Sequence, residues 1–103
     1  MTTIAYHRKM NMVTISGHTG WGEEGADIVC AAVSALTCTL AANLTDEIVR
    51  DAIVRLEPGD ATIHAAARPR YKNVVTLIFD TIAQGYQCLA EKYPDNVHFS
   101  IYA

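Results

Sequence analysis

The chain has 103 residues, of which 50% are hydrophobic and 18% are charged, and its formal net charge is −3. This length is that of one ordinary domain, so we expect a single domain over residues 1–103. The composition excludes a disordered tail. The chain also has no basic stripe that would neutralise phosphates, so we expect no direct binding of nucleic acid.

The cysteines indicate a reducing compartment. The chain has an odd number of cysteines and no CxxC pair, so we expect neither a disulfide framework nor a zinc site. The three cysteines are Cys30, Cys38 and Cys88. Free thiols are typical of the cytoplasm. The N-terminus does not resemble a signal peptide, and polar residues interrupt the apolar stretch at 28–44. We therefore expect a cytoplasmic protein that spans no membrane and holds no metal or cofactor.

The first part of the chain predicts a hairpin followed by an unusual loop. Residues 3–8 and 12–16 alternate as strands do, and residues 9–11 can turn the chain between them. Four of the nine residues at 17–25 are glycine. Glycine permits backbone geometry that other residues resist, so we expect a mobile or specially shaped loop there.

Residues 26–44 predict a helix. Apolar side chains recur at spacings of three and four, and they form one stripe: Val29, Val33, Leu36, Leu40 and Leu44. Asp27 lies near the start, where a carboxylate can accept hydrogen bonds from the free N–H groups of the first turn. We expect Asp27 to cap this helix.

The second half is less certain in one segment, because residues 47–56 fit a helix and a strand equally well. The turn at 57–60 and the alternation at 61–65 favour a second hairpin. Residues 72–93 have a helical period that Pro94 ends, and residues 97–102 alternate. The predicted order is β-β-α-β-β-α-β. This order indicates an α+β fold with two helices packed on a mainly antiparallel sheet.

His18 and Cys30 carry the candidate chemistry. His18 lies at a strand end, and Cys30 lies in the first turn or so of the predicted helix. A helix start stabilises a thiolate, and a neighbouring histidine can take the thiol proton and later protonate a leaving amine. The spacing alone is weak evidence, since a helix cysteine is usually a small buried hydrophobe. Trp21 fits a loop anchor and a substrate contact equally well.

A denser pattern surrounds this pair. Gly17-His18, a short glycine-containing loop, and Gly25-x-Asp27-Ile28-Val29-Cys30-Ala31-Ala32-Val33-Ser34 together resemble the signature of the ribosomal-processing cysteine protease family, Prp. The resemblance implies a catalytic dyad of His18 and Cys30, with Asp27 and Ser34 as supporting residues. It also implies that the intervening loop binds substrate, through Gly17, Gly20, Trp21, Gly22 and Gly25.

The resemblance further implies a cysteine endopeptidase that removes a short N-terminal extension from a protein of the large ribosomal subunit. Family members are bacterial and cytoplasmic, often homodimeric, and relatives in phages suggest a phage structural protein as another substrate. Amides of the helix start or of residues 20–25 are the expected oxyanion donors. Glu23 and Glu24 would suit a basic peptide. The alternative is a non-catalytic dimeric assembly factor with the same fold and an inert Cys30.

Overall fold

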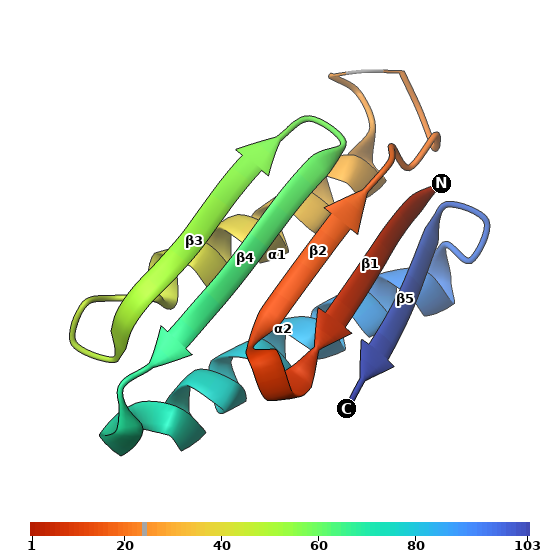
Figure 1. The fold of residues 1–103 in the computed structure, drawn as a ribbon. Helices are drawn as coiled ribbons and strands as arrows, with labels where there is room; N and C mark the ends of the chain where they lie inside the picture. The colour runs from red at the N-terminus through yellow and green to blue at the C-terminus, as the bar shows by residue number, and fades with distance from the viewer. Residues whose placement is uncertain (24) are drawn as a thin grey trace.

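Five strands form one mixed sheet in the computed structural model, which describes residues 1–23 and 25–103 (Figure 1). The elements are β1 (Thr2–His7), β2 (Met12–Ser16), α1 (Ile28–Asn43), β3 (Val49–Glu57), β4 (Asp60–Ala67), α2 (Lys72–Lys92) and β5 (Val97–Tyr102). Short 3-10 helices occupy Arg8–Met10 and Pro69–Tyr71. The α+β class and the order β-β-α-β-β-α-β are confirmed.

The sheet has the strand order β3-β4-β2-β1-β5. Three neighbouring pairs are antiparallel, and β1 pairs with β5 in parallel. A parallel neighbour needs a long connection that crosses over the sheet, and α2 supplies it immediately before β5. The sheet is therefore mainly antiparallel, as predicted, with one parallel pair at an edge.

The segment at 47–56, which the sequence left undecided, lies in the edge strand β3 from Val49 onward, and residues 47 and 48 belong to the turn before it. Val54 pairs with Ile63 and Leu56 pairs with Ala61 of β4, so the antiparallel ladder supplies the backbone hydrogen bonds of the segment. Val54 and Leu56 remain 47% and 45% exposed. Burial therefore contributes little to the choice of strand over helix, and the pairing with β4 decides it.

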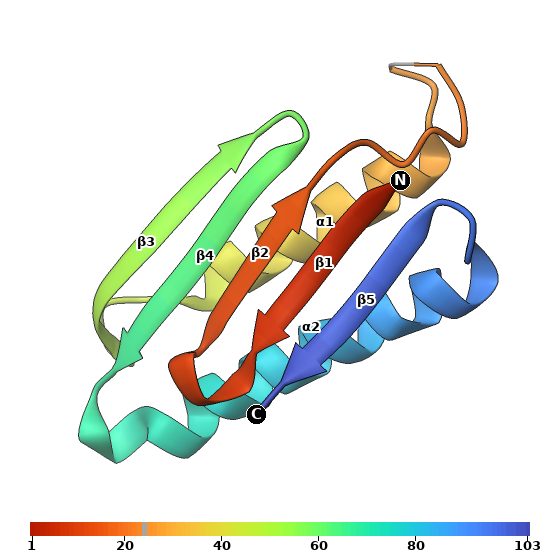
Figure 2. The same cartoon turned by 45° about the vertical axis from the view of Figure 1, so that its right-hand side comes forward.

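Both helices cover the same face of the sheet (Figures 1 and 2). The core lies between them and β1, β2 and β4, and its largest fully buried side chains include Tyr6, Phe79 and Tyr86. Burial raises the pKa of the Tyr86 hydroxyl to about 12, and this hydroxyl lies 2.8 Å from the hydroxyl of Thr37 on α1. None of the described helices is long and apolar enough to cross a membrane.

Several segments meet at one end of the sheet. β2 ends at Ser16, which pairs with Asp60 at the start of β4, so the turn between β3 and β4 lies beside the end of β2. α1 begins at the same end, after the glycine-rich loop (Figure 2). The topology thus places the segment that follows β2, the first turns of α1 and the β3–β4 turn around one region.

Candidate active site

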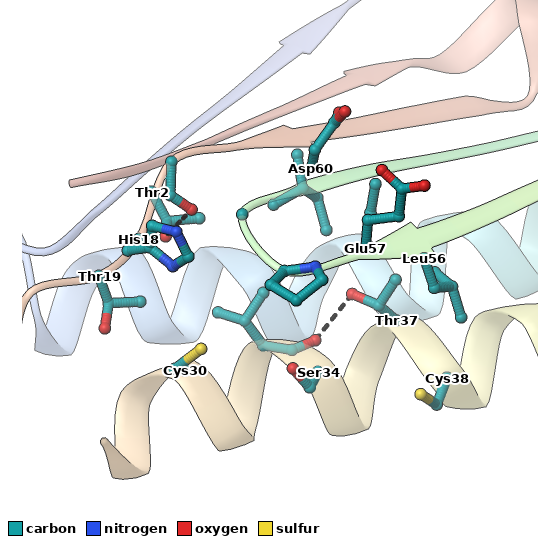
Figure 3. A pocket seen from close by; sticks show the side chains of 16 residues that line it. Thr2, His18, Thr19, Cys30, Ser34, Thr37, Cys38, Leu56, Glu57 and Asp60 are labelled. Atoms are coloured by element: carbon teal, nitrogen blue, oxygen red, sulfur yellow. Dashed lines mark hydrogen bonds between the residues drawn. The ribbon is translucent and has the colours of Figure 1, made fainter. Parts of the chain in front are cut away.

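A pocket of about 390 Å³ lies between α1, the end of β2 and the β3–β4 turn (Figure 3). A second pocket of similar volume lies beside the glycine-rich loop. Three side chains line both pockets: His18, Cys30 and Ser34. These three predicted site residues are therefore gathered on the boundary between two hollows.

His18 is held against the β3–β4 turn. The amide of Gly17 donates to the carbonyl of Gly59 over 2.9 Å. The imidazole ring of His18 lies so close to Gly59 that an added Cβ would be 2.7 Å from Nε2. The turn at 57–60 thus forms a wall for the histidine. Sequence reasoning missed this role, because the turn carries no recognisable motif and meets His18 only in the fold.

Cys30 is the third residue of α1 and is half-buried. Figure 3 shows its sulfur and the ring of His18 extending into the same hollow from opposite walls. Within residues 1–23 and 25–103, no hydrogen bond joins the two side chains. Catalytic contacts in ligand-free proteins are often long and tighten only around substrate.

Asp27 caps α1, as predicted, and also ties the loop to the helix. Its Oδ1 accepts from the Cys30 amide over 2.9 Å. Its Oδ2 accepts from the Thr19 hydroxyl and from the amides of Trp21 and Gly22, over 3.2 and 3.3 Å respectively. The Thr19 hydroxyl and these amides hold the pKa of the carboxyl below its ordinary value, against the opposing effect of desolvation.

This arrangement changes the expectation for the oxyanion donors. The amides of Trp21 and Gly22 point at the Asp27 carboxylate, and so does the amide of Cys30. The carboxylate accepts hydrogen bonds from these amides, and an anionic group of a substrate would need the same donors. These three amides are therefore engaged in the present conformation.

The remaining loop residues have distinct positions. Gly17, Gly20 and Gly25 adopt positive φ, and Gly20, Gly22 and Gly25 line the second pocket. Trp21 lines neither pocket, and its ring lies edge-on to Tyr93 at 6.4 Å. This contact fits a loop anchor, and the substrate contact of Trp21, whose side chain is 46% exposed, stays a prediction. The expectation for Glu24 falls outside the described residues.

The other cysteines differ from Cys30 in their surroundings. Cys38 lies two turns further along α1 and lines the far part of the first pocket, whereas Cys88 lies on α2, and both are exposed. In the described part of the chain, no three His, Cys, Asp or Glu side chains are grouped so that they could hold a metal ion.

A thiol at a helix start and an imidazole on a common pocket are the groups that acyl transfer through a thioester requires. The fold and the pocket are thus compatible with a cysteine hydrolase. The family model described as Cysteine protease Prp matches residues 1–98. The chain belongs to this family of cysteine proteases.

Solved structures share the fold. SMU.848 from Streptococcus mutans is 30% identical, with a TM-score of 0.69, over 97% of this chain and 90% of that chain. The essential ribosomal processing protease Prp from S. aureus, in complex with a substrate peptide, is 22% identical with a TM-score of 0.71, and the match covers 99% of this chain and 100% of that chain. The same protease with a covalently linked product peptide is 23% identical with a TM-score of 0.70, and the match covers 98% of this chain and 97% of that chain. No curated protein sequence matches the chain significantly.

Proposed function

We propose that the chain is a cysteine endopeptidase in which Cys30 is the nucleophile and His18 is the general base. The observation that supports this most directly is that both side chains line the two pockets on either side of them. A peptide that crosses from one pocket to the other would pass over the sulfur. Membership of the cysteine protease family supports the same assignment.

The reaction would proceed in two stages. His18 takes the proton from the Cys30 thiol, and the thiolate attacks the peptide carbonyl carbon to form a tetrahedral intermediate. The intermediate collapses to a thioester as the C–N bond breaks, and the histidine returns its proton to the leaving amine. Water, deprotonated by His18, then attacks the thioester and releases the carboxylic acid and the free thiol.

Two further residues would support this chemistry. Asp27 binds the amide of Cys30 and the loop that follows His18, so it would hold the start of α1 and the loop in one arrangement. Ser34 lies one turn beyond Cys30 and lines both pockets, so its hydroxyl would contact the bound peptide. The glycines at 20, 22 and 25 would let the peptide approach the loop backbone closely.

The proposed substrate is a short, basic N-terminal extension of a large-subunit ribosomal protein, or a phage structural protein. The S. aureus relative is described as a ribosomal processing protease. Glu57 and Asp60 line the first pocket, and Arg55 forms ion pairs with both. One uncompensated negative charge remains in this group, and it would favour a basic peptide modestly at low salt. We also propose, from the family resemblance, that the protein acts in the bacterial cytoplasm and forms a homodimer.

Cleavage assays on matched variants test the proposal. Wild type, Cys30→Ala and His18→Ala are incubated with N-terminal peptides of ribosomal proteins and with phage structural proteins, and products are identified by mass spectrometry. Cys88→Ala serves as the matched control, because this thiol lies on α2 away from both pockets. We expect one cleavage site with the wild type and the control, and no cleavage with the other two variants.

Two results would contradict the assignment. Continued cleavage by Cys30→Ala would remove this thiol from the mechanism. Failure of the wild type to cut any candidate would favour the non-catalytic assembly factor. Size-exclusion chromatography with light scattering on the same samples decides the homodimer separately.

A further inference from the structure

The corner between α2 and β5 contacts the glycine-rich loop, although it is distant from it in sequence. The side-chain amide of Asn96 donates to the carbonyl of Thr19 over 2.8 Å. The backbone of Asn96 is itself fixed, because its amide donates to Tyr93 over 3.0 Å and its carbonyl accepts from Thr2 over 2.9 Å. The donor group therefore projects toward the loop from a rigid position.

The contact continues from Thr19 into the candidate active site. Thr19 directly follows His18, is only 2% exposed, and donates its hydroxyl to the Asp27 carboxylate. The other oxygen of that carboxylate accepts the Cys30 amide. A chain of hydrogen bonds thus runs from Asn96 through Thr19 and Asp27 to the backbone of Cys30.

A second contact reinforces the first. The ring of Trp21 lies edge-on to the ring of Tyr93, and the ammonium of Lys92 lies 5.8 Å from the centroid of the Tyr93 ring. Edge-to-face aromatic pairs are favourable beyond the area they bury. Because glycines give a loop little conformational preference of its own, the contacts with Asn96 and Tyr93 add to the hydrogen bonds with Asp27 in defining its shape.

We propose that Asn96 is a positioning residue for the active site. By holding the carbonyl of Thr19, it fixes the backbone next to His18 and the position of the Asp27 carboxylate at the start of α1. Asn96 lines neither pocket, so it acts through Thr19 and not on the substrate. The effect on catalysis rests on the proposed function, whereas the effect on the loop does not.

The test replaces the amide of Asn96 by a group that cannot donate. Asn96→Asp places a carboxylate oxygen against the Thr19 carbonyl, and Asn96→Ala removes the donor without adding charge. Asn43→Asp is the matched control, because its side-chain amide also donates to a backbone carbonyl over 2.8 Å, at the exposed end of α1 far from the loop. Circular dichroism identifies the variants that are folded. If Asn96→Asp does not fold, the test rests on Asn96→Ala alone.

Amide hydrogen exchange of Trp21 and Gly22, which donate to Asp27, reports on the loop directly. We expect exchange roughly tenfold faster in the Asn96 variants, and unchanged in the control. With a cleavable peptide, kcat should fall on the order of tenfold or more while KM stays within about twofold, because small displacements of reacting groups cost rate and not ground-state binding.

Unchanged exchange at both amides in folded Asn96→Ala would overturn the proposal. Faster exchange with unchanged kcat would also overturn it, because the loop would then not position the reacting groups. If the wild type cuts no peptide, the proposed function fails, and the rate of Cys30 alkylation takes the place of kcat. Faster exchange with altered alkylation still supports positioning by Asn96, and faster exchange with unaltered alkylation refutes it.

Discussion

Gly59→Ala should reduce catalysis by displacing His18. Gly59 has a φ of +70° at the β3–β4 turn, and its Cα faces the imidazole ring. An added methyl group would lie 2.7 Å from Nε2 and 2.9 Å from Cε1, whereas ordinary contact begins at 3.4 Å. The ring must therefore move by about 0.7 Å, which is the difference between 3.4 and 2.7 Å.

The expected effects on stability and rate are separable. Left-handed backbone costs an alanine about 1–2 kcal/mol relative to glycine, and each kcal/mol lowers the Tm of a domain of this size by about 4–8 °C. The ring is the free end of a flexible side chain, so its movement adds little to this cost. A misplacement near 1 Å costs on the order of a hundredfold in rate, so we expect kcat to fall roughly tenfold or more.

Two assays measure these effects on wild type, Gly59→Ala and Gly59→Asn. Peptide cleavage gives kcat, and calorimetry gives Tm. Asparagine tolerates the left-handed conformation better than alanine, but it carries the same Cβ. We expect Gly59→Asn to recover part of the Tm and to stay slow. If Gly59→Asn recovers full kcat, backbone strain and not contact with His18 carries the effect. Full kcat in Gly59→Ala would refute the reasoning outright.

Two further predictions concern the start of α1. Cys30 should react with iodoacetamide faster than Cys38 and Cys88 at neutral pH, although the other two thiols are more exposed. Mass-spectrometric mapping that shows equal or slower labelling of Cys30 would argue against activation. The lowered pKa of Asp27 means that its contribution to stability is complete at neutral pH and is lost as pH falls below about 4, through the folded pKa. Asp27→Asn should therefore lower Tm at neutral pH, by a difference that shrinks as the pH falls through the lowered pKa of Asp27; a difference that stays constant with pH in calorimetry would contradict this.

Local patterns were sufficient for most of the fold. The alternation at 12–16 and 97–102 matches β2 and β5 in their bounds, and the helical periods at 26–44 and 72–93 contain α1 and α2. These patterns depend on residues close together in the chain, so they survive without knowledge of the fold. The segment at 47–56 was undecided, because its strand state depends on pairing with β4.

In the candidate site, too, some features follow from local sequence and others from the tertiary structure. The sequence by itself determined the cap at Asp27 and the family pattern around His18 and Cys30, because helix starts and signatures are local. Only the tertiary structure decided that the turn at Gly59 forms the wall behind His18, and that Asn96 binds Thr19 across 77 positions of sequence. The sequence marks Gly59 as part of a turn but not as a neighbour of His18, and no local feature marks Asn96. Each acts through a contact that exists only once the sheet has paired and the ends of its strands have been brought together.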